Sequence, residues 1–144
     1  MGFYLNAMQN LTINTVKSLV SEKVVSLATS GAVLLHGDSF EQMDKLIEHG
    51  VRVSLIFSDP PYFLSNGGMT CSAGRMVSVD KGAWDKSVSF LDVCTFHRSW
   101  IRRCLNLLSA SGTIWISATQ HSAFIIGYIL QELGCSIINV VTWE

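Results

Sequence analysis

The stretch "IFSDPPYFLSNGG", residues 56–68, decides how this sequence is interpreted. The run Val53–Ser58 is almost continuously apolar, which predicts a strand buried on both faces. It ends at Asp59, and both prolines of the chain follow directly as Pro60 and Pro61. Proline fixes φ near about −65° and removes a backbone donor. The sequence therefore predicts either a rigid turn or a chemical site at the carboxyl end of a strand.

Outward from this strand, the pattern predicts alternating helices and strands. Ser39-x-x-Gln42 fits a capping box at a helix start, and a glycine stands at or shortly after each of the four expected helix ends. The expected order is a helix at 12–30, a strand at 32–36, a helix at 39–49, the strand at 53–58, a long loop at 64–89, a helix at 96–108, a strand at 113–117, a helix at 121–133 and a strand at 136–143. Such alternation predicts an α/β fold with a mostly parallel sheet.

Composition narrows the possible functions. The 144 residues can bury one core, and they are 49% hydrophobic and 15% charged with a net charge of −1. This near-neutral balance argues against strong nucleic-acid binding by the chain unaided. No apolar run reaches the roughly 18 residues of a membrane span, and the N-terminus lacks a secretory pattern. We expect a cytoplasmic protein.

The four cysteines do not suggest a metal site. No CxxC pair occurs, and no nearby histidine completes a zinc pattern. We expect free thiols in a reducing compartment and no metal. The cysteines are Cys71, Cys94, Cys104 and Cys135.

Two acids follow predicted strands, and both are candidates for a site. Ligands of parallel sheets bind at the carboxyl ends of strands, so Asp38 and Asp59 are expected to face one crevice. Asp59 and a proline-braced carbonyl supply two acceptors, and Tyr62 or Phe63 supplies a flat face. An exocyclic amine on a planar base would fit, because fixed acceptors stabilise positive charge developing on its nitrogen by about 3–4 kcal/mol per group.

The string Asp-Pro-Pro-Tyr, residues 59–62, resembles the catalytic motif of amino-methyltransferases that use S-adenosylmethionine. Asp at its first position points to adenine N6. The strings "DPPYFLSNGG" (59–68) and "VSVDKGAWDK" (77–86) are similar to bacterial β-group adenine-N6 DNA methyltransferases of restriction–modification systems, including the type that modifies GATC. The resemblance covers about 33–144. It implies an incomplete, Rossmann-like methyltransferase fold and methyl transfer to an adenine flipped out of double-stranded DNA.

The resemblance implies roles for the motif residues. The Asp59 carboxylate and the Pro60 carbonyl would accept hydrogen bonds from the target N6 amine, with Pro61 as part of the same catalytic motif. Tyr62 would stack on the flipped adenine, and Phe63 would form part of the pocket wall.

The resemblance also implies contacts outside the motif. Asp38, together with Asp59, would bind the methyl donor. Lys81 and Trp84 would contact the DNA substrate from the loop 64–86, with Lys86 near phosphates.

Simpler interpretations remain open for several of these residues. Asp-Pro-Pro could be a rigid turn and nothing more. Asp38 could cap a helix without binding a ligand, and the segment 81–85 could be a solvated loop. The function could also be methylation of RNA or of protein glutamine. A third possibility is a non-catalytic remnant that binds a partner through exposed strand edges.

The resemblance shows a departure as well. The family's glycine-rich donor-binding motif and its target-recognition region have no counterpart in the sequence. We therefore expect residues 32–144 to be the N-terminal, catalytic-motif half of a methyltransferase domain, preceded by a helical extension at 1–31. The isolated chain is expected to be inactive, and its partner to be the missing C-terminal half or a second copy.

Overall fold

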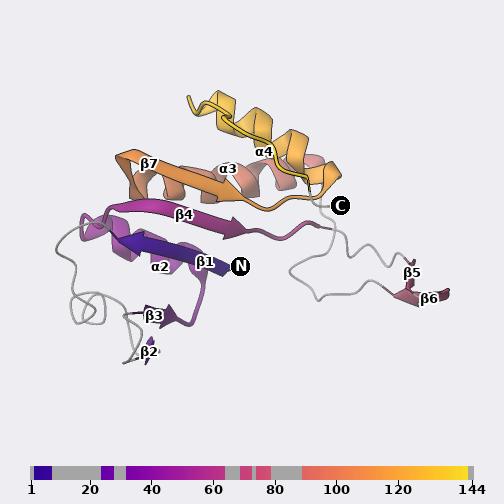
Figure 1. Ribbon diagram of the computed structural model, residues 1–144, viewed down its shortest axis with the longest axis horizontal. Coiled ribbons are helices and arrows are strands. Elements are labelled where there is room, and N and C mark those ends of the chain that lie inside the picture. The colour runs from indigo at the N-terminus through magenta and orange to yellow at the C-terminus, as the bar shows by residue number, and fades with distance from the viewer. Residues whose placement is uncertain are drawn as a thin grey trace. The chain divides into compact units, whose positions relative to one another are not determined.

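The computed structural model describes residues 2–7, 24–27, 32–63, 69–72, 74–78 and 89–142 (Figure 1). The chain divides into two compact units, and each is described by itself. The first unit comprises Met1–Asp59 and Trp100–Ser117, and the second comprises Pro60–Ser99 and Ala118–Glu144.

A three-stranded sheet forms the centre of the first unit (Figure 1). Its order is β1 (Gly2–Ala7), β4 (Val53–Asp59) and β7 (Leu108–Ile116). β4 and β7 are parallel, whereas β1 runs antiparallel to β4. The predicted strands at 53–58 and 113–117 are therefore confirmed, and they are parallel to each other. Among the strand pairs that the structure describes, the others are antiparallel, so the expectation of a mostly parallel sheet holds for β4 and β7 only.

Two helical segments cover one face of this sheet. They are α2 (Ser39–Glu48) and the part of α3 (Phe90–Leu107) that begins at Trp100, and both lie behind the sheet in Figure 1. Side chains from the helices and from alternate positions of β4 are buried together, as expected for an amphipathic helix on a sheet. The buried apolar residues of this unit are Met43, Leu46, Val51, Val53, Ile56, Trp100, Ile101, Cys104 and Leu107.

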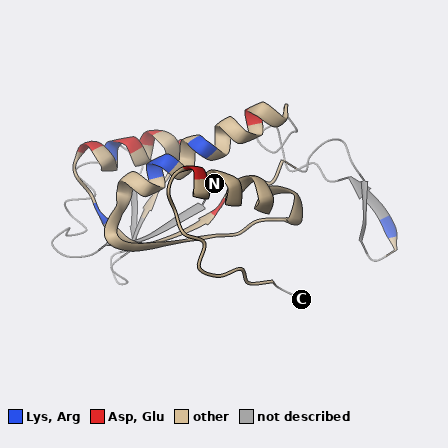
Figure 2. Ribbon diagram, turned by 90° about the horizontal axis from the view of Figure 1, so that it is seen from above, with Lys and Arg blue, Asp and Glu red and all other residues tan. Residues whose placement is uncertain are grey.

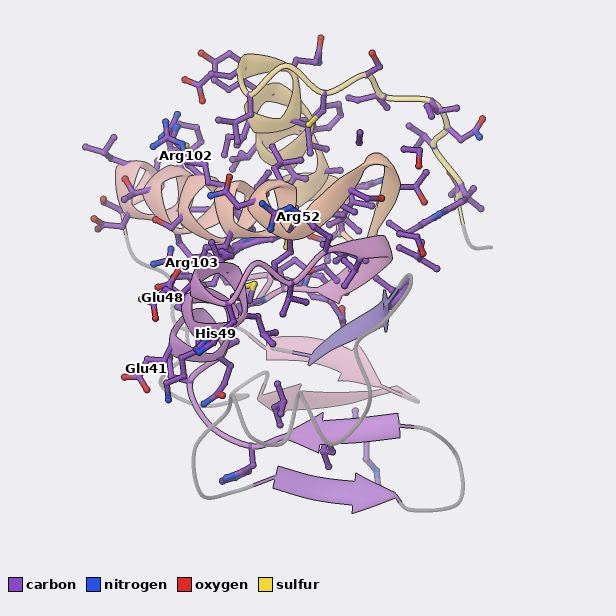
Figure 3. The ribbon with its side chains drawn as sticks, turned by 90° about the vertical axis from the view of Figure 1, so that its left-hand side faces the viewer. Glu41, Glu48, His49, Arg52, Arg102 and Arg103 are labelled. Carbon is purple, nitrogen blue, oxygen red and sulfur yellow. The ribbon has the colours of Figure 1, made fainter. Side chains whose placement is uncertain are left out.

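Arg103 connects α3 to α2 (Figure 3). Its guanidinium donates to both oxygens of Asp44, at 2.8 and 2.9 Å, and lies 4.6 Å from the centre of the Phe40 ring. Two parallel hydrogen bonds and a ring face suit arginine better than lysine.

We expect Arg103→Ala to lower the free energy of unfolding by about 1 kcal/mol, because the pair is partly exposed and screened by solvent. Arg103→Lys should restore only part of this loss. Urea unfolding monitored by circular dichroism measures the change. Arg102→Ala, at the exposed neighbouring position, is the matched control, and equal stability of the two alanine variants would contradict the assignment.

The N-terminal region differs from the prediction. Gly2–Ala7 form β1, and Val24–Leu27 form β2, which pairs antiparallel with β3 (Ala32–Leu35). The expected helix over 12–30 is therefore wrong at Val24–Leu27, and the rest of that range lies outside the described residues. Val24 and Val25 are β-branched, and pairing with β3 gives their backbone a ladder that outweighs the helical spacing. The domain division at residue 31 stays a prediction.

The expected long loop contains a hairpin. β5 (Met69–Ser72) and β6 (Arg75–Ser78) pair antiparallel, and Gly74 between them has φ 76°, which favours glycine at a tight turn. The loop prediction is wrong for these two strands. The remaining residues of 64–88 lie outside the described residues.

The second unit ends in a helix and an extended apolar segment. α4 (Gln120–Glu132) is confirmed, and Gly134 after it has φ 83°, as expected at a helix end. The predicted strand at 136–143 is wrong over 136–142, which form neither helix nor strand. Val140 is 85% exposed, and no charged side chain occurs in 133–142, which is tan in Figure 2. A strand needs a neighbour to pair its backbone, and none of the described strands pairs with this segment.

Candidate active site

Asp59 is the last residue of β4, at the carboxyl end of the strand. Its side chain is exposed, as the motif requires for contact with a ligand. Ser117 directly follows β7, the parallel neighbour. The Ser117 N–H donates to Ser58 O at 2.9 Å, and the Ser117 hydroxyl lies 2.5 Å from Asp59 Oδ1. The carboxylate is thus held at the point where two parallel strands end, where α/β sheets bind ligands.

The face of the sheet that carries Asp59 is apolar and exposed. Side chains alternate along β4, so Leu55 and Phe57 lie on the same face as Asp59, while Ile56 and Ser58 are buried on the other. Phe57 is paired in register with Trp115 of β7, and their exposed fractions are 42% and 50%. Exposed aromatic groups beside a carboxylate indicate a surface that meets another molecule or segment.

The rest of the motif belongs to the second unit. Pro60 is buried, and Pro61, Tyr62 and Phe63 are half-buried. Phe63 has φ 55°, an uncommon conformation for a bulky residue. Both prolines lack an N–H, so this part of the backbone offers acceptors and few donors.

The Phe63 ring packs on aromatic residues of α3. Ring centroids are 5.3 Å from Phe96 and 5.8 Å from His97, with edge-to-face geometry in both pairs. The structure thus gives Phe63 a packing role, and its predicted place in a pocket wall stays a prediction.

His97 is fully buried in α3, and burial lowers its pKa to about 4. The imidazole is therefore neutral at pH 7. The sequence did not single out His97 as a functional or a structural residue. Its helical position among Phe96, Trp100 and Ile101 was the available signal.

Asp38 caps α2, which corrects the predicted capping box that began at Ser39. Its Oδ1 accepts hydrogen bonds from Phe40 N at 2.9 Å and Glu41 N at 3.1 Å. β3, which precedes it, belongs to a two-stranded sheet and not to the sheet of β4. Asp38 and Asp59 were expected in one crevice because their strands were expected to share a sheet edge. The two strands belong to different sheets, so that premise is wrong.

The other predicted contacts fall outside the description. Lys81, Trp84 and Lys86 lie outside the described residues.

Within the described part of the chain, no cluster of three or more histidine, cysteine or acidic residues could hold a metal ion. Cys94, Cys104 and Cys135 are free thiols, and burial raises the pKa of Cys104 to about 12. None of the described helices is long and apolar enough to cross a membrane.

Ser117 is the site residue that sequence reasoning missed. Nothing in the string "TIWISAT" marks it as functional. The available signal was positional, since it follows the second predicted parallel strand as Asp59 follows the first.

β4 ends at Asp59 and is followed by Pro60-Pro61-Tyr62, and the parallel strand β7 lies beside it, so the motif in which the sequence resembles amino-methyltransferases stands at the carboxyl end of a strand. A family model described as DNA methylase (N6_N4_Mtase) matches residues 53–144, well over half of the chain. The chain belongs to this DNA methylase family.

Three relatives are similar to most of the chain. It is 46% identical over 113 residues to the Type II methyltransferase M2.LlaDCHI of Lactococcus lactis subsp. cremoris, covering 78% of this chain and 41% of that protein. It is 44% identical over 112 residues to M2.DpnII of Streptococcus pneumoniae, with the same coverage, and 45% identical over 92 residues to M2.MboI of Moraxella bovis, covering 64% and 34%. The chain thus spans about two fifths or less of the length of these relatives.

Proposed function

We propose that this chain is the catalytic-motif part of a site-specific DNA adenine-N6 methyltransferase of a restriction–modification system. The observation that carries the proposal is the exposed Asp59 carboxylate, fixed at the carboxyl end of β4 and followed by Pro60-Pro61-Tyr62. Family membership and relatives named Type II methyltransferases support it. The substrate is double-stranded DNA, and the reaction takes place in the cytoplasm.

The motif acts on the target amine through hydrogen bonds. The Asp59 carboxylate and the Pro60 carbonyl accept the two N6 hydrogens of an adenine flipped out of the duplex. This grip directs the nitrogen lone pair toward the incoming methyl group and stabilises the positive charge that grows on the nitrogen. S-adenosylmethionine, when bound, supplies an electrophilic methyl group on a sulfonium centre. The methyl group would pass from the sulfonium sulfur to N6, so that the S–C bond breaks as the N–C bond forms and a neutral thioether is left. N6 would carry the positive charge at that point and would then lose one of its protons to water.

The remaining predicted residues orient the two ligands. Tyr62 stacks on the flipped base, and Phe63 supports it from its packed position. Lys81 and Trp84 hold the DNA. For the methyl donor, the proposed acceptors are Asp59 and Asp38, both exposed carboxylates. This role rests on the family resemblance and not on a shared sheet edge, and Asp38 would use the oxygen that does not cap α2.

The fold of the complete domain is Rossmann-like, and this chain supplies part of it. Two features support this proposal: the exposed face at Leu55, Phe57 and Trp115, and the segment 136–142, with which none of the described strands pairs. We propose that the part of the methyltransferase that these residues pack against is the region that the relatives have and this chain does not match. A second copy is the alternative occupant.

Trp115→Glu tests this packing. We expect it to prevent this chain from associating with a separately expressed polypeptide that corresponds to the unmatched region of M2.DpnII, because a charge would replace a half-exposed aromatic side chain. Co-purification measures the association. Asn106→Glu, at an exposed position of α3 on the opposite side of the sheet, is the control for added charge. Normal association of Trp115→Glu, or self-association of this chain that the substitution abolishes, would contradict the proposed occupant.

A methyl-transfer panel tests the function. The chain, completed by that polypeptide, is incubated with tritiated S-adenosylmethionine and double-stranded DNA, RNA or protein. We expect label in DNA, recovered as N6-methyladenine. Label only in RNA or only in protein glutamine would exclude the proposal, and absence of label from all three would favour a non-catalytic interaction module.

A further inference from the structure

We infer that Ser117 is a positioning residue for Asp59, and that its hydroxyl fixes the carboxylate in the orientation that grips the target amine. This inference rests on the proposed function. It concerns a residue outside the Asp-Pro-Pro-Tyr motif, contributed by the strand beside it.

The contacts of Ser117 define its role. Its hydroxyl lies 2.5 Å from Asp59 Oδ1 and 3.3 Å from Ser58 O. A hydroxyl has one proton, and the carboxylate is both the closer and the charged acceptor. The proton is therefore donated to Asp59, while the backbone N–H of Ser117 donates to Ser58 O.

The strand pairing makes this arrangement stiff. Ser58 and Ile116 are partners in the parallel register, so the next residues, Asp59 and Ser117, are brought side by side by the ladder itself. Asp59 is exposed, and an exposed aspartate samples several rotamers unless a partner selects one. Ser117 supplies that partner from a rigid element.

The Ser117 contact does not by itself exclude the substrate amine from the Asp59 carboxylate, because the Ser117 hydroxyl contacts Oδ1. A carboxylate offers about four lone-pair positions on two oxygens, and the Ser117 proton uses one of them. Fixing the acceptor before the amine arrives lowers the cost of reaching the reactive geometry.

Ser58 provides a matched control. It is adjacent to Asp59 but points to the opposite, buried face of β4, and its hydroxyl has no hydrogen-bond partner in the described part of the chain. Removing the Ser58 hydroxyl therefore changes a serine next to the site without changing the Asp59 carboxylate.

The test uses the complete methyltransferase that contains this chain, with Ser117→Ala, Ser117→Thr and Ser58→Ala. Single-turnover methylation at saturating DNA and donor is compared with DNA affinity. We expect Ser117→Ala to lower the methyl-transfer rate constant by about 10- to 100-fold and to leave DNA affinity within about twofold. Ser117→Thr, which keeps the hydroxyl, should recover most of the rate, and Ser58→Ala should match the wild type.

A second readout does not depend on activity. In this chain labelled with ¹³C aspartate, the Asp59 carboxyl resonance should move in Ser117→Ala, return with Ser117→Thr, and stay in place in Ser58→Ala. A wild-type methyl-transfer rate constant in Ser117→Ala would overturn the inference. An Asp59 carboxyl resonance that does not move in Ser117→Ala would overturn it as well. If either result is obtained while Asp59→Ala is inactive in the same assay, only the positioning role of Ser117 is contradicted, and the proposed function stands. Activity in Asp59→Ala would remove the proposed function itself.

Discussion

Asp59→Ala is expected to lower adenine methylation by about a thousandfold or more in the complete methyltransferase. The substitution removes one of the two acceptors for the amine, together with the negative charge that balances the developing positive charge. The substitution also removes the hydrogen bond from Ser117, but the Asp59 side chain is exposed, so the free energy of unfolding should fall by about 1 kcal/mol and the fold should be retained. Transfer of a tritiated methyl group to DNA measures the activity, and circular dichroism with urea unfolding measures the fold.

Two further variants separate charge from geometry. Asp59→Asn keeps one oxygen acceptor without the charge, and we expect an activity between those of alanine and wild type. Glu48→Ala removes an exposed carboxylate from the end of α2, far along the chain from the motif, and should leave methylation unchanged (Figure 3). Wild-type turnover in Asp59→Ala with a retained fold would contradict the mechanism.

The second large effect is a loss of stability in acid that depends on His97. Its pKa is lowered by burial from 6.5 to about 4, so the unfolded chain takes up the proton first as the pH falls. Above pH 6.5 the imidazole is neutral in both states and its contribution to stability is complete. Between pH 6.5 and about 4 that contribution is lost, and the total is about 3 kcal/mol.

His97→Leu tests this linkage. Leucine has a similar volume, can pack on Phe63 and Phe96, and does not titrate. Between pH 7 and pH 4, we expect the free energy of unfolding to decrease less in His97→Leu than in the wild type. The difference between the two decreases should be about 3 kcal/mol. His121→Leu, at an exposed position of α4, is the control. The same pH dependence in His97→Leu and the wild type would show that another group carries the acid sensitivity.

Local patterns were sufficient for the central elements. The apolar run that ends at Asp59 is β4, the spacing from Phe96 onward lies within α3, and Gly134 ends α4, because each signal is contained in a short segment. Asp59 was predicted at a strand end and is found there. These elements position the first residue of the motif.

The failures share a different physical cause. The segment 136–142 has strand character, but a strand forms only with a neighbour, and no described strand pairs with it. Val24–Leu27 have some helical spacing, yet pairing with β3 decides their structure. In both cases the structure depends on pairing outside the segment: β3 pairs with Val24–Leu27, and none of the described strands pairs with 136–142.

The same limit applies to the site. Ser117 reaches Asp59 only through the register of two strands that are 58 residues apart at this contact, and a local motif cannot contain that information. Asp38 followed a predicted strand just as Asp59 did, but its strand belongs to another sheet. The two acids differ in the sheet to which the preceding strand belongs, and the sequence alone does not give that information.

The most direct measurement is the position of the target adenine in a crystal structure of the complete methyltransferase with its DNA and a non-reactive donor analogue. We predict that N6 of an extruded adenine lies about 3 Å from an Asp59 carboxylate oxygen and from the Pro60 carbonyl oxygen. An adenine that stays stacked in the duplex, or one whose N6 is held by other groups while Asp59 points elsewhere, would contradict the account.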